Sequence, residues 1–228
     1  MTRYAEISQQ LIKVQESIER VCVISGRQSS DITLVVVTKN FPVEDVQILY
    51  DLGVREFGEN RDQEGALKSA QLPRDIKWHF QGKLQGRKIK SIARWASLIH
   101  SLQSIDNARK FDAFEDNESH SYFVQVNFEP DREDRGGVAE VNLEGFLADL
   151  HQQTMIRPIG LMTVAPLKCD PTSTFVRLQR LQEGLVGSFP HLVNLSMGMS
   201  GDFEAAIAAG ATHIRIGSSI LGSRGILA

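Results

Sequence analysis

The sequence predicts a single (β/α)8 barrel, a TIM barrel, preceded by one extra helix. Strand-like and helix-like segments alternate along the whole 228-residue chain, and eight of these segments have the pattern of strands. Such alternation imposes parallel pairing, because each crossover helix returns the chain to the same edge of the sheet. Eight units close naturally into a barrel, and the length is near the ~250 residues typical of that fold. No linker or shift in composition divides the chain, so we expect residues 1–228 to form one domain.

The first expected element is an amphipathic helix within residues 1–30. Apolar residues recur there at intervals of three and four, the spacing of one helical face: Ile7, Leu11, Val14, Ile18 and Val21. We expect this apolar stripe to pack on the barrel, burying it against the lower end.

Eight short strands should follow, separated by helices. The first, at 34–38, is a run of aliphatic and β-branched residues without polar alternation, which is typical of a strand covered on both faces. Further strands are expected at 55–57, 76–80, 97–102, 121–127, 157–162, 194–197 and 213–216, and helices at 43–52, from 60, and at 84–95, 106–114, 141–154, 171–185 and 202–209. A doubly wound open sheet is the alternative, disfavoured because no Gly-x-Gly-x-x-Gly follows the first strand.

Composition narrows the classes of partner. The formal charge of −3 and pI near 6.1 give no overall attraction to nucleic acid or to an anionic membrane, and one local basic stretch (Lys83, Arg87, Lys88, Lys90 and Arg94) is expected to be a solvated helix face. Cys22 and Cys169 have no CxxC spacing, so neither a disulfide framework nor a metal site is expected. Without a signal-like or membrane-spanning apolar stretch, we expect a cytoplasmic protein.

Polar residues gather just past the expected strands. Lys39 follows the first strand and precedes Pro42, which cannot continue a central ladder. The active site of a (β/α)8 barrel lies at the carboxyl ends of its strands. A lysine partly removed from water there has a lowered pKa, which suits an amine that forms a Schiff base. Most lysines that end a strand are simply solvated, so Lys39 needs support from elsewhere.

That support comes from the loops after the seventh and eighth strands. Residues 198–201 (Gly-Met-Ser-Gly) and 217–219 (Gly-Ser-Ser) place small and hydroxyl residues where helices begin. Free N–H groups and a helix dipole at such points form a phosphate cradle, although glycine and serine also simply turn and cap chains. A cradle together with Lys39 specifies pyridoxal 5′-phosphate (PLP) more narrowly than other common ligands. Arg215 then either faces the pyridine nitrogen or clamps the phosphate.

Six segments of the chain resemble those of the pyridoxal phosphate homeostasis protein family. They are 37–42, 57–60, 78–85, 160–162, 195–200 and 215–218. The Trp-His-Phe of the third and the Ser-Met-Gly-Met-Ser of the fifth are together highly specific, and the match extends over nearly the whole chain.

This resemblance implies the fold-type III barrel shared with bacterial alanine racemase. It implies PLP bound as an internal aldimine on Lys39, with Arg215 meeting the pyridine nitrogen and Asn60 beside the ring. The residues that would hold the phosphate are Ser200, Gly217 and Ser218, with Ser196 nearby. Members of the family are regarded as PLP carriers that regulate vitamin B6 and amino-acid balance without established turnover, so apoenzymes that require PLP are the implied partners.

The chain departs from the family pattern in three places. Asn40-Phe41-Pro42 supplies no second lysine after Lys39, so a relay through such a group is unsupported. Gly86 stands where asparagine is usual, and Ser218 stands where threonine is common, a change that keeps the hydroxyl.

The alternatives are enzymes. A racemase on this barrel needs a second acid/base opposite the lysine, normally a tyrosine of another domain. Tyr4, Tyr50 and Tyr122 are all expected away from the site, which leaves the Cys169 thiol as the one candidate base, and we assign no catalytic residue.

Two further expectations concern the interior and the assembly. His79 and His100 fall within strands and are expected to be hydrogen-bonded core histidines. With no partner domain needed to complete the site, we expect a monomer or a weak homodimer.

An aldolase-type phosphosugar barrel would also explain Lys39 and the cradle, but not Arg215.

Overall fold

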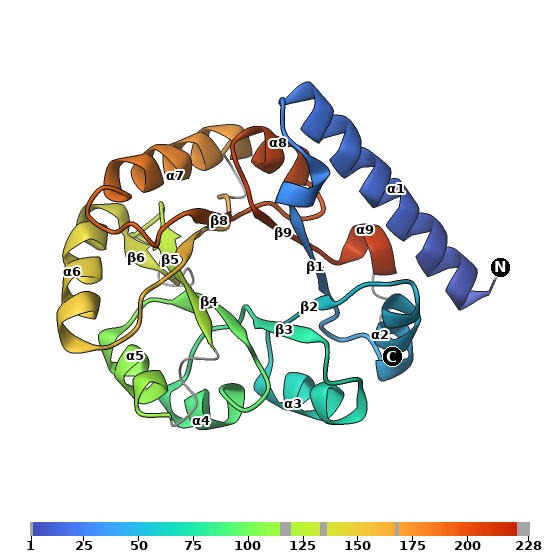
Figure 1. Ribbon diagram of the computed structural model, residues 1–228, viewed down its shortest axis with the longest axis horizontal. Coiled ribbons are helices and arrows are strands. Elements are labelled where there is room, and N and C mark those ends of the chain that lie inside the picture. Colours follow the sequence, from blue (N-terminus) through green and yellow to red (C-terminus); the bar gives the residue numbers. More distant parts are fainter. Residues whose placement is uncertain (1, 115–119, 133–135, 167–168, 223–228) are drawn as a thin grey trace.

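Eight parallel strands close into a barrel in the computed structural model, which describes residues 2–114, 120–132, 136–166 and 169–222 (Figure 1). Neighbouring strands pair in the order β4-β3-β2-β1-β9-β8-β7-β5, and β4 also pairs with β5, which closes the ring. The strands are β1 (Thr33–Val37), β2 (Glu56–Glu59), β3 (Lys77–Phe80), β4 (Leu98–Leu102), β5 (Ser121–Asn127), β7 (Gly160–Met162), β8 (Asn194–Ser196) and β9 (His213–Ile216). The predicted fold class is confirmed.

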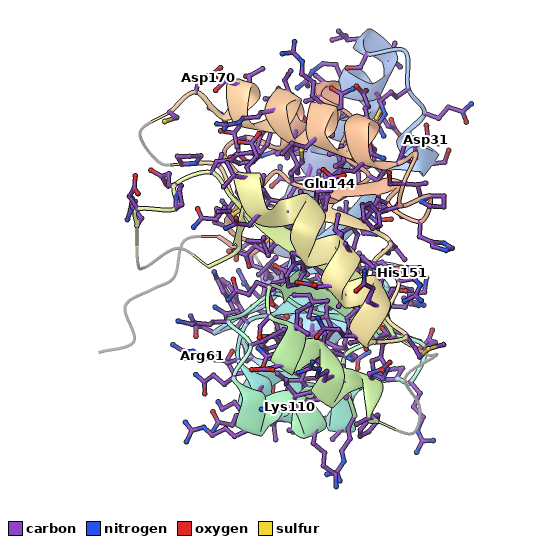
Figure 2. The ribbon with its side chains drawn as sticks, turned by 90° about the vertical axis from the view of Figure 1, so that its left-hand side faces the viewer. Asp31, Arg61, Lys110, Glu144, His151 and Asp170 are labelled. Carbon is purple, nitrogen blue, oxygen red and sulfur yellow. The ribbon has the colours of Figure 1, made fainter. Side chains whose placement is uncertain are left out.

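Helices surround the strands on the outside of the ring, as Figure 1 shows. They are α1 (Arg3–Ile24), α2 (Val43–Asp51), α3 (Asp62–Gln71), α4 (Ile89–Ile92), α5 (Ile105–Asp112), α6 (Leu143–Gln153), α7 (Pro171–Leu185), α8 (Phe203–Ala208) and α9 (Ser218–Leu221), with short 3-10 turns η1 (Ser29–Asp31), η2 (Gly86–Lys88) and η4 (Glu140–Asn142). Asp170, at the start of α7 in Figure 2, accepts hydrogen bonds from the backbone of Thr172 and Ser173. Among the described residues, none of the helices has both the length and the apolar content that a membrane span requires.

Helix α1 lies along the outside of the barrel instead of across its lower end, so the expected location is wrong. The predicted stripe is buried as expected, but against α9, α8 and α2. Polar contacts fix the same location: Arg3 bonds both Asp45 of α2 and the Leu221 carbonyl oxygen of α9, and Arg27 bonds the carbonyl oxygens of Ile207 and Ala211. The outer helices offer the apolar surface that this stripe needs.

Several element boundaries differ from those predicted, each for a local reason. Strand β7 begins at Gly160 rather than 157, since Pro158 has no N–H for the ladder. The helix expected at 84–95 is the turn η2 followed by α4, which begin at Gly86 and Ile89 without a side-chain cap. Strand β2 extends to Glu59 and so buries a carboxylate that was expected in a loop.

A ninth short strand, β6 (Val138–Ala139), pairs with the carboxyl end of β5 outside the ring. It follows the segment 131–137, of which 133–135 lie outside the described residues. The described part of this segment lies near the carboxyl end of β5, where Gln125 donates a hydrogen bond to the Gly136 carbonyl oxygen.

The interior of the barrel is polar and aromatic, unlike the apolar layer between strands and helices. His79, His100, His213 and Phe123 form one cluster of rings, with His100 stacked on Phe123 at a centroid distance of 4.7 Å. His79 and His100 are fully buried and hydrogen-bonded to each other, which confirms that they are satisfied core histidines. Arg215 lies above this cluster, toward the carboxyl ends of the strands.

Candidate functional site

A cleft of ≈ 540 Å³ opens at the carboxyl ends of the strands. Its lining comes from the last residues of β1 and β9 and from the segments after β1, β3, β8 and β9, in agreement with the rule that sites of this fold lie at that end. The lining residues are Val37, Lys39, Phe41, Gln81, Met199, Ser200, Gly201, Arg215, Gly217, Ser218 and Gly222.

Lys39 enters the cleft from a tight turn directly after β1. The Phe41 N–H bonds the Thr38 carbonyl oxygen at 3.0 Å, and Asn40 has a φ of 62°, in the left-handed region that asparagine tolerates. The carboxylate of Glu64 accepts the Asn40 N–H at 2.8 Å and so holds the turn from outside. The lysine is half-buried, on a rigid support.

A buried ion pair lies beneath this turn. The Lys68 ammonium donates to a Glu59 carboxylate oxygen at 2.6 Å and to the Thr38 carbonyl oxygen at 2.8 Å, and the Thr38 hydroxyl donates to the same carboxylate oxygen. Burial raises the pKa of Glu59, while the charge and hydrogen bond of Lys68 oppose that shift. The pair therefore anchors the residue that precedes Lys39.

Arg215 is a buried cation at the floor of the cleft. It is 4% exposed, and it donates to the Ser196 hydroxyl at 2.7 Å and to the Thr163 carbonyl oxygen at 2.9 Å. Burial lowers the pKa of Arg215 to about 10, which Asp202 partly offsets, so the guanidinium stays charged at neutral pH. It is a fixed hydrogen-bond donor at one end of the cleft.

Small residues form a cradle at the other side. Helix α9 begins at Ser218, and the N–H groups of Gly217 and Ser219 point toward the Ser200 hydroxyl oxygen at 3.3 Å each. Gly198 has a φ of 92°, and a Cβ there would lie 2.6 Å from the Cβ of Ala206, so the loop requires glycine. Backbone donors and hydroxyls converge there, as in anion sites.

Five of the seven residues predicted for the site line this one cleft: Lys39, Ser200, Arg215, Gly217 and Ser218. Ser196 does not line it, since it is fully buried beneath Arg215. Asn60 is exposed and lies outside the lining. Its backbone carbonyl oxygen packs against Gly82, where a Cβ would come within 2.1 Å of it.

Sequence reasoning missed four side chains of the lining: Val37, Phe41, Gln81 and Met199. Gln81 follows β3 directly, and this location at a strand end was a usable signal. Its buried Nε2 atom has no hydrogen-bond partner among the described residues, so the cleft contains an unused donor. Phe41 and Met199 add apolar surface, for which the sequence had no periodic signal.

The candidate acid/base residues of the enzyme alternative lie elsewhere. Tyr4 is in α1, Tyr50 is in α2 and bonds Asp75, and Tyr122 is buried in β5 against Phe111. Cys169 is an exposed free thiol and does not line the cleft.

Comparison with known proteins agrees with this architecture. The profile of the family described as alanine racemase, N-terminal domain, matches residues 14–225. A pyridoxal phosphate homeostasis protein of Mycobacterium tuberculosis H37Rv is 33% identical over 247 residues, covering 97% of this chain and 94% of that protein. The protein of the same name from Aquifex aeolicus is 34% identical, covering 95% of this chain and 97% of its own.

The chain belongs to the pyridoxal phosphate homeostasis protein family. A solved structure, that of PipY of Synechococcus elongatus with PLP bound, is 32% identical and superposes with a TM-score of 0.78, covering 90% of this chain and 100% of PipY. An alanine racemase of Clostridium difficile superposes with a TM-score of 0.74 at 12% identity, and the match covers 57% of that enzyme. At this identity the likeness shows a shared fold alone. Membership of the family confirms the resemblance found in the sequence.

Proposed function

We propose that this protein binds PLP covalently through Lys39 and carries or buffers it for vitamin B6 and amino-acid homeostasis. One observation carries the proposal: a strand-end lysine, a buried arginine and an anion cradle line a single cleft. A relative with PLP bound has the same fold and 32% identity, which supports this ligand over a phosphosugar.

The residues present fit this cofactor. Ser200, Gly217 and Ser218 would hold the phosphate, and Arg215 would face the ring nitrogen. The unpartnered Nε2 of Gln81 is a donor that a polar substituent of the ligand could use. When bound, PLP supplies an aldehyde carbon open to an amine and a ring that withdraws electrons. Because Arg215 stays charged and can only donate, it favours an unprotonated ring nitrogen and so a weaker electron sink.

Carriage fits the cleft better than turnover. Among the residues that the structure describes, no tyrosine lines it, so a racemase would lack the second acid/base that it needs. The relatives are named as homeostasis proteins, not as enzymes. Slow racemization remains the alternative activity, with exchange of the amino-acid α-proton into heavy water as its assay.

The first experiment is absorption spectroscopy, borohydride reduction and peptide mass mapping of the protein supplied with PLP. We expect a visible band and a reduced pyridoxyl adduct on Lys39, both lost in Lys39→Ala. Lys83→Ala, an exposed lysine just past β3, is the matched control and should keep both. A wild-type protein with neither band nor adduct would refute the proposal and favour the phosphosugar barrel.

Three finer statements belong to the same proposal. The recipients would be apoenzymes that require PLP, tested by reconstituting one in the presence of a trap for free PLP. A monomer or weak homodimer would suffice, because the lysine, the arginine and the anion cradle all belong to the same barrel. A cytoplasmic location is consistent with the free cysteines Cys22 and Cys169.

A further inference from the structure

An unbroken chain of hydrogen bonds runs through the barrel interior from Arg215 to Glu56. Arg215 Nη1 lies 2.7 Å from Ser196 Oγ, and Ser196 Oγ lies 2.7 Å from His100 Nδ1. His100 Nε2 lies 2.8 Å from His79 Nδ1, and His79 Nε2 lies 2.7 Å from Glu56 Oε2. Five strands contribute to it: β9, β8, β4, β3 and β2, which begins at Glu56.

This chain of hydrogen bonds connects the cleft to the opposite end of the barrel. Ser196, His100 and His79 are fully buried, and Arg215 is 4% exposed. The Glu56 side chain is 22% exposed, and Lys77 Nζ lies 3.1 Å from its other oxygen. The cation at the floor of the cleft therefore has a carboxylate at the far end of a buried relay.

Chemistry fixes the direction of every bond in this chain when both histidines are neutral. A carboxylate only accepts, so His79 must carry its proton on Nε2 and accept at Nδ1. His100 must then donate from Nε2 and accept at Nδ1, which leaves the Ser196 hydroxyl to donate to His100 and accept from Arg215. All the bonds point from Arg215 toward Glu56.

The groups around the chain favour these protonation states. Burial is the main cause that lowers the pKa values of His79 and His100. Lys77 lowers the pKa of His79 further, and Arg215 and His213 lower that of His100, whereas Glu56 raises the pKa of His79. Burial opposes ionisation of Glu56, but His79 and Lys77 bring its pKa below the ordinary value. Neutral histidines and an ionised Glu56 are the consistent set at neutral pH.

We infer that Glu56, His79 and His100 are positioning residues for Arg215: the one-way relay makes Ser196 an acceptor and so fixes the guanidinium as a charged donor toward the cleft. Two of the five N–H donors of Arg215 are committed, one to Ser196 and one to Thr163. Because Arg215 also lines the cleft, its remaining donors would be available to a ligand there. This inference rests on the proposed function for the identity of that ligand.

The competing view is that the chain only satisfies buried polar groups inside the barrel. Both views predict that a broken chain lowers stability. Only the positioning role predicts that a change at Glu56 alters the electronic state of a ligand bound at the other end.

The first test needs no cofactor. Nitrogen NMR of isotope-labelled histidine distinguishes the two neutral tautomers from the imidazolium. At neutral pH we expect His79 and His100 to be neutral and protonated on Nε2. A proton on Nδ1 of His100, or a charge on either ring, would overturn the inference, whatever the protein binds.

The second test uses Glu56→Gln with PLP bound. Loss of the charge should weaken PLP binding about tenfold and shift both the absorption band and the ring-nitrogen resonance of labelled PLP. Glu56→Asp, which keeps the charge, should restore the spectrum at least in part. An unchanged spectrum and affinity in Glu56→Gln would refute the positioning role.

Two controls separate this effect from general damage. Glu204→Gln removes a carboxylate that pairs with Arg20 on the outside of the barrel, and Leu11→Ala lowers stability at α1. Neither should move the ring-nitrogen resonance. If wild type forms no adduct on Lys39, the proposed function fails, while the tautomer measurement still decides whether the relay exists. The tautomer result also stands if Glu56→Gln does not fold.

Discussion

At the scale of single residues, the buried ion pair of Lys68 and Glu59 should be especially sensitive to mutation. Lys68→Met would leave the Glu59 carboxylate buried, with its second oxygen already unpartnered among the described residues. Removing one partner of a buried pair costs about 3–5 kcal/mol of stability. We expect that loss in urea unfolding, with weaker PLP binding because the Thr38 carbonyl oxygen below Lys39 also loses its donor.

Lys90→Met is the matched control for this prediction. Lys90 is exposed, as are Lys83, Arg87 and Arg94 of the same basic stretch, which the sequence predicted to be solvated. Its replacement should change the free energy of unfolding by less than about 0.5 kcal/mol. Equal effects of the two substitutions would contradict a special role for the buried pair.

Gly198 supplies a second residue-scale prediction. Gly198→Ala combines a positive φ with a Cβ contact of 2.6 Å, so we expect a loss of about 1–3 kcal/mol and weaker binding of an anion at the neighbouring cradle. Gly184→Ala in α7 places its methyl in open space and should stabilise by about 0.5–1 kcal/mol. Opposite signs for the two variants in thermal unfolding support this reading, and a tolerated Gly198→Ala contradicts it.

At the scale of elements, α1 is a structural part of the barrel's outer layer. Leu11 is 3% exposed in its apolar stripe, whereas the next residue, Ile12, is 50% exposed. Leu11→Ala should therefore cost about 2–5 kcal/mol, and Ile12→Ala about 0.5 kcal/mol or less. Denaturant titration of the two variants measures this directly. Similar losses for both would mean that α1 is not docked by this face.

Elements with strong local signals were predictable from sequence, and those set by distant contacts were not. Helix α7 has the predicted bounds because Asp170 caps it and Pro171 suits its first turn. Strand β6 has only two residues, too few for any periodic pattern. The strand-end rule found Lys39 and Arg215 in the cleft.

The relay below Arg215 was not predictable in the same way. His79 and His100 meet only because β3 and β4 are neighbours, and Ser196 reaches them across the closed barrel. The sequence identifies both histidines as core residues, but no local spacing shows that they connect Arg215 to Glu56. Likewise, the pair of Lys68 with Glu59 depends on β2 extending two residues beyond its expected end.

At the scale of the whole molecule, the histidine cluster predicts how stability depends on pH. Burial lowers the pKa values of His79 and His100, and lowers that of His213 to about 4. In the unfolded chain these rings take up protons near the ordinary value of about 6.5. The folded state therefore binds fewer protons, so stability is full above about pH 6.5 and is lost as the pH falls below it. Glu59, whose pKa is raised, acts in the opposite direction.

Each ring that stays neutral in the folded state contributes at most about 1.4 kcal/mol per pH unit, a limit approached only well below pH 6.5, before the opposing effect of Glu59. Urea unfolding at a series of pH values between 7 and 5 measures the slope. His213→Gln should remove one increment, because His213 lies in the ring cluster but outside the hydrogen-bonded relay. A slope below one increment in wild type would mean that the rings accept protons in the folded state, and the neutral relay to Arg215 would then fail with it.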